Sequence, residues 1–166
     1  MSKMKNKTIL SLCGYTGNWS APYKEDGYEV IQVDIKMGKD AILWPSDISS
    51  EPRFSREFSD ISSYDIYGVI AQPVCTYFAG SGASHKRTDE QIKEGLSLVD
   101  ACIRIAWAVR PHFFVMENPV GKLRRWIGPP LQIFHPWEYA GYLDNPTERE
   151  RVIQREPAFG ATLICQ

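Results

Sequence analysis

The amino-acid sequence predicts an α/β fold, in which a mostly parallel sheet carries helices on both faces. Short apolar stretches that end in glycine, proline or a polar residue alternate along the chain with helix signals, and no internal repeat interrupts them. This is the pattern of βαβ units. With 166 residues, 43% of them hydrophobic, the chain is large enough to form a core of its own. We therefore expect residues 1–166 to form a single domain.

Four short apolar stretches are predicted as strands, because turn residues bound each of them and they contain β-branched or aromatic side chains. They comprise residues 7–14, 29–35, 67–73 and 112–119. Between the first two, residues 19–28 predict a short helix that ends at Gly27. Two prolines interrupt residues 36–63, so we expect at most one short helix there, around residues 53–58.

The strongest helix signal follows the third strand. Thr88 and Gln91 have the spacing of a capping box, and the two acidic residues between them suit the positive end of a helix. Apolar residues then recur at spacings of three and four and produce one apolar face. These residues are Ile92, Leu96, Val99, Ile103 and Ala106. Pro111 ends this helix before the fourth strand begins.

The C-terminal part of the chain carries weaker signals. Residues 135–141 contain several aromatic residues within a short segment. This composition favours a packed turn over a surface on which a nucleic-acid base stacks. Residues 145–157 are charged and predict a short helix or a loose segment, so we expect residues 144–166 to be a loosely packed C-terminal segment. Within it, residues 160–166 predict a last strand that pairs at a sheet edge.

Composition and charge narrow the classes of protein. The net charge of −1 argues neither for nor against a nucleic-acid partner, because binding needs only a local basic patch. The four cysteines form no CxxC pair and have no metal-ligand spacing with the three histidines, so we expect no metal. No apolar core of a signal peptide follows the basic start, and no stretch approaches the roughly 18 apolar residues of a membrane span. We expect a cytoplasmic protein without a membrane partner.

The residues suited to catalysis or ligand binding lie at the predicted carboxyl ends of the strands. In parallel sheets, ligands bind outside these ends. Gly14 and Gly17 follow the first strand, where glycines allow a ligand to approach the backbone closely. Asp34 ends the second strand about 20 residues further on, the spacing at which a carboxylate accepts hydrogen bonds from ribose hydroxyls. The glycines do not form GxGxxG, which favours a small adenosine-containing cofactor over a dinucleotide.

Cys75 and Glu117 stand at the ends of two strands that a single crossover helix places side by side. A cysteine in an open loop is accessible, and its thiolate is a nucleophile. A glutamate in the same cleft can form a hydrogen bond with a substrate. Partial burial raises the pKa of this glutamate, so that its protonated carboxyl can donate a proton. The plainer alternatives are an unreactive cysteine and a capping or salt-bridging carboxylate. Together the two residues favour covalent catalysis on a polarisable ring.

The order of glycine loop, acidic strand end, Pro-x-Cys and Glu-Asn-Pro resembles that of the C5-cytosine DNA methyltransferases. The similar segments are "CGYTG", "PSDIS", "GVIAQPVCTYFAGSG" and "ENP", within residues 8–123. The resemblance implies a Rossmann-like fold that depends on S-adenosylmethionine. Val74 departs from it by replacing the second proline of the nucleophile motif, and Leu10 and Leu12 stand where the family carries aspartate and phenylalanine. The segment after Pro119 is too short for a recognisable target-recognition region.

The resemblance implies a role for each matching residue. Cys75 would add to C6 of a cytosine in DNA while Glu117 holds the N3 and N4 edge, so that C5 accepts a methyl group. Asp34 would bind the ribose and Asp47 the adenine of S-adenosylmethionine. The full set implied for the cofactor is Cys13, Gly14, Tyr15, Thr16, Gly17, Trp19, Asp34, Ile35, Asp47, Ile48 and Pro73. The set expected to contact the substrate is Asn118, Pro119, Lys86 and Arg87.

Two other functions stay open. The first is a non-catalytic relative that serves as a binding partner or regulatory subunit, which Val74 and the missing recognition region favour. The second is an enzyme that modifies a pyrimidine in a nucleotide or in single-stranded nucleic acid. If the protein acts on duplex DNA, the cytosine must be flipped out of the stack. Contacts to nucleic acid would then come from the loop at residues 76–87 and from the basic run at residues 122–125, which contains Lys122, Arg124 and Arg125. A homodimer or a partner subunit would supply target recognition.

Overall fold

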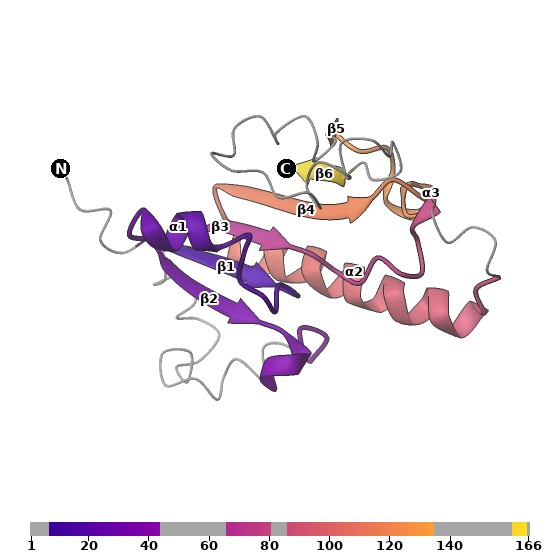
Figure 1. Ribbon diagram of the computed structural model, residues 1–166, viewed down its shortest axis with the longest axis horizontal. Helices are drawn as coiled ribbons and strands as arrows, with labels where there is room; N and C mark the ends of the chain where they lie inside the picture. The colour runs from indigo at the N-terminus through magenta and orange to yellow at the C-terminus, as the bar shows by residue number, and fades with distance from the viewer. Residues whose placement is uncertain (1–6, 44–65, 81–85, 135–160, 166) are drawn as a thin grey trace, which may run out of the picture.

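The computed structural model describes residues 7–43, 66–80, 86–134 and 161–165, the last range for the backbone alone (Figure 1). Its elements, in chain order, are β1 (Thr8–Leu12), α1 (Ala21–Glu25), β2 (Glu29–Val33), the 3-10 turn η1 (Ile35–Met37), β3 (Ile66–Ala71), α2 (Asp89–Val109), β4 (Phe113–Pro119), α3 (Arg124–Ile127), β5 (Gln132–Phe134) and β6 (Ala161–Cys165). The predicted helix at 53–58 and turn at 135–141 lie outside the described residues.

The described strands form one sheet in the order β2-β1-β3-β4-β6-β5. Strands β2, β1, β3 and β4 are mutually parallel, whereas β6 runs antiparallel to both β4 and β5. This confirms the predicted α/β class with a mostly parallel sheet. The chain moves outward from β1 to β2 and then returns to place β3 on the other side of β1. The carboxyl ends of β1 and β3 therefore flank a topological switch point, where open α/β sheets bind their ligands.

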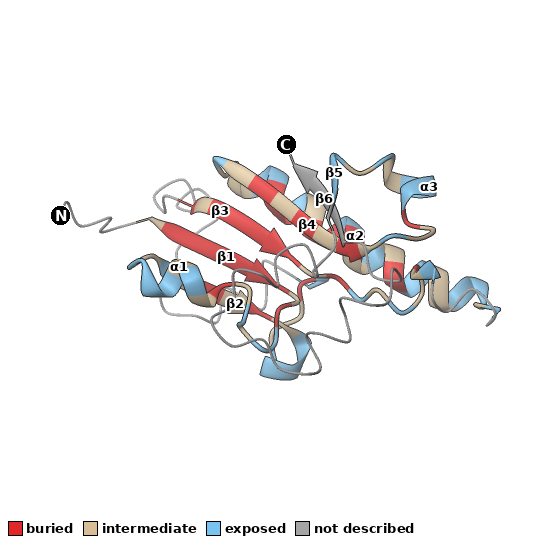
Figure 2. Cartoon of the chain, turned by 45° about the horizontal axis from the view of Figure 1, so that its top comes forward, coloured by how far each residue is buried: buried red, intermediate tan, exposed pale blue. Residues whose placement is uncertain are grey.

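Helix α2 runs along strands β3 and β4 and covers one face of the sheet (Figure 1). Its residues Val99, Cys102 and Ile105 are almost fully buried and join one core cluster with residues of β1, β2, β3 and β4. The predicted apolar face is confirmed, since Ile92, Leu96 and Ile103 pack against this cluster and Val99 and Ala106 belong to it. Figure 2 shows the result: strands β1 and β3 are buried, while much of α2 away from the sheet is exposed.

The opposite face of the sheet carries α1. Successive side chains on a strand point to opposite faces, so Phe113 lies on the face away from Phe114 and the α2 core. The Tyr23 ring of α1 stacks on Phe113 with a centroid separation of 6.2 Å. Phe113 in turn lies over Gly68 in β3, where a side chain would collide with its ring. A helix thus lies on each face, as the sequence predicts.

The ends of α2 follow the predicted local rules. The Thr88 hydroxyl accepts the Gln91 backbone N–H at 3.2 Å, and the Gln91 side chain accepts the Thr88 N–H at 3.0 Å, so the capping box is confirmed. At the other end Arg110 takes a left-handed conformation with φ 49°. Pro111 follows and cannot continue the helix.

Several boundaries differ from the sequence prediction. Strand β2 ends at Val33 rather than Ile35, because the Asp34 carboxylate accepts the Lys36 backbone N–H at 2.9 Å and starts η1. The predicted last strand exists, but its edge position was wrong, since β5 pairs outside it. The sequence did not predict β5 or α3. Both are too short to show a clear period in their apolar residues.

The contact between Gly68 and Phe113 yields a prediction for stability. Gly68→Ala places a methyl group against the Phe113 ring in a buried strand, and we expect it to lower the free energy of unfolding by about 1–3 kcal/mol. Urea denaturation measures this cost. In a Phe113→Leu background the ring is gone, so the cost of Gly68→Ala should fall. An equal cost in both backgrounds would show that the ring is not the cause.

Candidate active site

The glycine loop after β1 lies at the switch point of the sheet. The backbone N–H of Gln72, just beyond β3, donates to the Leu12 carbonyl at 2.9 Å and joins the two strand ends. A Cβ atom at Gly14 would lie 2.8 Å from the Ser11 Oγ and 3.3 Å from the Gln72 Oε1. Only glycine fits this position without displacing a neighbour. The backbone of the glycine loop therefore packs closely against Ser11 and Gln72 at the predicted binding site.

A glutamine of β2 holds the same loop from the other side. The Gln32 Nε2 donates to the Gly14 carbonyl at 3.0 Å, and Gly17, with φ 71°, lies directly over this side chain. The Ser20 hydroxyl also donates to the Gly17 carbonyl at 3.0 Å. The sequence analysis missed Gln32. A polar residue inside an otherwise apolar strand was the signal that could have revealed it.

The other residues expected at the cofactor are spread around this loop. Tyr15 and Thr16 are exposed, Trp19 is half-buried, and Cys13 places its Sγ 4.0 Å from the Cys102 Sγ. Asp34 is half-buried at the end of β2, and Ile35 beside it is exposed. Although the Asp34 carboxylate already accepts the Lys36 N–H, a carboxylate retains capacity for further donors such as ribose hydroxyls. Asp47 and Ile48 lie outside the described residues.

The loop that carries Cys75 begins at Pro73, which is buried. The Cys75 carbonyl accepts the backbone N–H groups of Phe78 and Ala79, both at 2.9 Å, and so forms a tight turn. Cys75 itself is half-buried, and Val74 before it is 36% exposed. The proposed nucleophile is therefore held in an ordered turn and remains partly accessible.

This turn is tied to the segment that follows β4. The Lys122 N–H donates to the Phe78 carbonyl at 2.8 Å, and Ala79 forms a β-bridge with Gly121. A side chain at Gly121 would run into the Phe78 backbone, so the two segments meet only because this residue is glycine. The Phe78 side chain is fully buried. We call this contact between residues 78–80 and 120–122 the loop bridge; the sequence analysis did not predict it.

The charge of the Glu117 carboxylate affects the pKa of the Cys75 thiol. Burial raises the pKa of the Glu117 carboxyl, and a hydrogen bond from the Gln72 side chain opposes this rise. Burial also raises the pKa of the Cys75 thiol, and the negative charge of Glu117 raises it further. The structure thus brings together the two residues that the sequence analysis selected. In this state the Cys75 thiol is protonated at neutral pH.

Asn118 connects the end of β4 with the segment that follows β3. It is 1% exposed, and its Nδ2 donates to the Pro73 carbonyl at 3.1 Å. Its Oδ1 has no hydrogen-bond partner within the described part of the chain. Asn118 also lines a hollow of about 30 Å³ between β4 and α3, which is large enough for a water molecule. Pro119, the last residue of β4, is half-buried and pairs with Ala161 of β6.

The basic residues expected at the substrate have different roles. The Arg87 guanidinium donates twice to the Thr76 carbonyl, at 3.1 and 2.9 Å, and so orders the turn after Cys75. Lys86 before it is exposed. Arg124 and Arg125 are exposed on α3, directly after the loop bridge. The latter two and Lys86 are the charges best placed to reach a phosphate.

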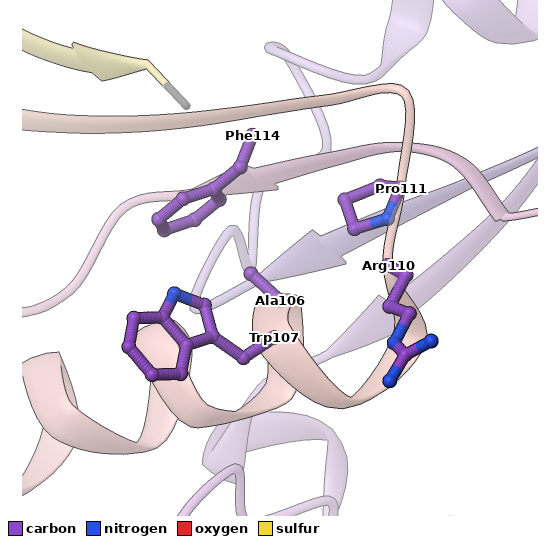
Figure 3. Close-up of a pocket in the computed structure, with 5 residues that line it drawn as sticks. All are labelled: Ala106, Trp107, Arg110, Pro111 and Phe114. Carbon is purple, nitrogen blue, oxygen red and sulfur yellow. The ribbon is translucent and has the colours of Figure 1, made fainter.

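A larger hollow lies away from these residues, at the amino end of β4. It has a volume of about 330 Å³ and is lined by Ala106, Trp107, Arg110, Pro111 and Phe114 (Figure 3). In Figure 3 the rings of Trp107 and Phe114 lie on one side of Ala106, with Pro111 and Arg110 on the other. Neither Cys75 nor Glu117 contributes to it. We therefore base the candidate site on the switch point and the polar residues around it.

Two further features concern metal binding and membrane spanning. Across the residues that the structure describes, no group of three or more His, Cys, Asp or Glu side chains is arranged to hold a metal ion. Over the same residues, no helix has both the length and the apolar character needed to cross a membrane.

No protein-family model matches this chain, and no curated protein matches it significantly. A fold of this kind hosts many unrelated functions. The function must therefore be argued from the chemistry of the site.

The charge interaction at the site gives a pH prediction. Because the Glu117 charge helps to raise the pKa of the Cys75 thiol, Glu117→Gln should lower that pKa and increase the thiolate fraction at any pH below it. We expect Cys75 to react faster with iodoacetamide at pH 8 in this variant. Mass spectrometry of the peptide containing Cys75 measures the rate. A Glu25→Gln variant, changed at an exposed position of α1, serves as the control; equal rates in all three proteins would contradict the interaction.

Proposed function

We propose that the protein transfers a methyl group from S-adenosylmethionine to C5 of cytosine in DNA, through a covalent adduct with Cys75. One observation carries the proposal. A half-buried cysteine and a half-buried glutamate stand at the ends of adjacent parallel strands, close enough for the carboxylate to raise the pKa of the thiol. Beside them, a glycine loop occupies the switch point of the sheet. This combination suits covalent attack on a ring whose opposite edge is held by a carboxyl group.

The strand order favours a methyltransferase fold. The reversed strand β6 lies between β4 and β5 at the end of an otherwise parallel sheet. The parallel part of the sheet, with its switch point between β1 and β3, agrees with the Rossmann-like fold that the resemblance implies. The topology supports the fold only, because related sheets carry many activities.

The residues around β1 and β2 suit the cofactor. S-adenosylmethionine, when bound, supplies an electrophilic methyl group. Gly14 lets the loop backbone pack closely on the ends of β1 and β3, because a Cβ atom there would lie 2.8 Å from the Ser11 Oγ. Asp34 lies one strand away with a carboxylate that can accept hydrogen bonds from ribose hydroxyls. Residues at the ends of β1 and β2 would thus hold the adenosine part of S-adenosylmethionine.

The two central residues have complementary tasks. The Cys75 thiolate forms a bond to C6 of the ring, and the electron density that this bond supplies reaches C5. Glu117 binds the N3 and N4 edge and shares a proton with N3, a role that its raised pKa favours. After C5 has been methylated, its proton passes to solvent while the C6–S bond breaks, which expels the Cys75 thiolate and restores the C5–C6 double bond.

Substrate binding itself would activate the nucleophile. In the free protein, burial raises the pKa of the Cys75 thiol, and the Glu117 charge raises it further. A base that shares a proton with Glu117 offsets this charge, which lowers the pKa of the thiol and favours the thiolate. A bound base would therefore increase the thiolate fraction of Cys75.

DNA is the partner that the surroundings favour. Lys122 lies in the loop bridge, and Arg124 and Arg125 follow it on α3, so three cations stand beside the turn that carries Cys75. Contacts of cations with phosphates confer affinity with little sequence preference. We therefore expect salt-sensitive binding, most readily to single strands or mismatches where flipping a base costs least.

The cofactor assignment predicts the behaviour of one variant. Asp34→Ala removes the proposed acceptor for the ribose hydroxyls and should weaken S-adenosylmethionine binding by about 1.5–3 kcal/mol. Isothermal titration calorimetry measures the affinity. Asp100→Ala, which removes an exposed carboxylate from α2, should bind the cofactor normally. If the unmutated protein fails to bind S-adenosylmethionine, the cofactor assignment is wrong.

The covalent step predicts a trapped complex. Cys75→Ser should reduce methyl transfer to cytosine in DNA by a factor of 1,000 or more, on the order of other lost nucleophiles, while cofactor affinity changes little. DNA that contains 5-fluorocytosine cannot lose a proton from C5, so it should remain attached to the unmutated protein. Denaturing electrophoresis detects the adduct, and ordinary cytosine DNA is the control. Methyl transfer by Cys75→Ser would rule out this chemistry.

A further inference from the structure

Two cysteine side chains meet between the glycine loop and α2. Cys13 is the first residue after β1, and Cys102 lies in α2, 89 residues further along the chain. Their sulfur atoms are 4.0 Å apart, the separation of a hydrogen bond in which either thiol can donate. Both are free cysteines. The proposed methyl transfer does not use the Cys102 thiol.

The two thiols differ in their access to solvent. Cys13 is half-buried, whereas Cys102 is 0% exposed and belongs to the core cluster. The hydrogen bond with Cys13 and burial hold the pKa of the Cys102 thiol well above its usual value. An oxidant from solvent therefore reaches Cys13 first, and Cys102 lies in place to react with the oxidised sulfur. This is the arrangement of an oxidation-sensitive cysteine beside a resolving cysteine.

We propose that Cys13 and Cys102 form an oxidation site, at which a peroxide converts the two thiols into a disulfide between the glycine loop and α2. First, the Cys13 sulfur attacks an oxygen of hydrogen peroxide. The O–O bond breaks, a sulfenic acid forms on Cys13, and the thiol proton leaves with the departing hydroxide as water.

The second step closes the disulfide. The Cys102 sulfur attacks the Cys13 sulfur, the S–O bond breaks, and the departing hydroxide takes the Cys102 proton and leaves as a second water molecule. The two thiols thus lose two electrons, which reduce one peroxide. Because the sulfurs of a disulfide are about 2.05 Å apart, they must approach each other by about 2 Å.

The glycine loop is the part that would move. Cys102 is fully buried within a helix of 21 residues, which holds it in place. Cys13 follows the end of a strand and has a left-handed φ of 60°, which is uncommon for a residue other than glycine. Its N–H donates to the Val33 carbonyl at 2.7 Å, and the next carbonyl, that of Gly14, accepts the Gln32 side chain. A pull on the Cys13 sulfur would therefore disturb the contacts of the loop with β2.

The disulfide would thus weaken binding at the glycine loop. This consequence rests on the proposed function, which assigns the loop to S-adenosylmethionine, whereas the disulfide itself rests on the two neighbouring sulfurs. We expect the oxidised protein to bind S-adenosylmethionine about tenfold more weakly, within the usual range of coupling between two sites. Reduction of the disulfide should restore the affinity.

Peptide mapping of the full chain tests the oxidation site. Trypsin releases Cys13 within residues 8–24 and Cys102 within residues 94–104, and neither peptide contains another cysteine. After treatment with hydrogen peroxide, mass spectrometry without reductant should detect these two peptides joined, and dithiothreitol should separate them. Cys75→Ser, which keeps both thiols, should give the same joined peptides. Cys102→Ala should give none, and dimedone should trap a sulfenic acid at Cys13 in this variant.

Isothermal titration calorimetry with S-adenosylmethionine separates this inference from the proposed function. It is carried out on reduced and oxidised Cys75→Ser, in which Cys75 cannot be oxidised. If the disulfide forms but the reduced protein binds no S-adenosylmethionine, the proposed function fails and the oxidation site stands. Equal affinities before and after disulfide formation would show that the effect on the loop is wrong. Absence of the joined peptides from both the unmutated protein and Cys75→Ser would overturn the oxidation site.

Discussion

The loop bridge is the constraint on which the candidate site depends. Cys75 lies on a turn outside the sheet, and a turn of this kind is free to move unless the backbone beyond it is held. The hydrogen bond from Lys122 to the Phe78 carbonyl and the pairing of Ala79 with Gly121 tie that turn to the chain leaving β4. Glu117 lies on β4 itself. The nucleophile and the carboxyl are therefore held by one continuous backbone contact, and a side chain at Gly121 would separate them.

Within that frame, burial and hydrogen bonding oppose each other. Loss of solvent raises the pKa of Glu117, and the amide of Gln72 lowers it. Whatever charge Glu117 keeps then acts on Cys75, whose thiol is already disfavoured as a thiolate by its own burial. The reactivity of Cys75 is thus set by its neighbours. The Glu117 charge is one of the two causes that raise the pKa of this thiol, and burial is the larger one.

The glycine loop connects this pair to the rest of the sheet. The Gly14 carbonyl accepts the Gln32 side chain of β2, and the Gln72 side chain just beyond β3 lies against Gly14, so glutamines on both sides of β1 flank the loop. Because β1 and β3 are central strands and their ends meet at the switch point, the loop, Cys75 and Glu117 all open on the same edge of the sheet. The fold determines where this edge lies, and the side chains at the edge determine which chemistry the site can perform.

The amino-acid sequence by itself determined the features that depend on near neighbours. The capping box of Thr88 and Gln91 and the strand ends before Cys75 and after Glu117 are local, so propensity and spacing predicted them. The tertiary structure alone decided the contacts between distant segments. The bond from Gln32 to Gly14 spans 18 residues and that from Asn118 to Pro73 spans 45. Likewise the place of β6 inside the sheet depends on β5. Such contacts follow from how strands align in space, and the sequence carries no periodic signal for that alignment.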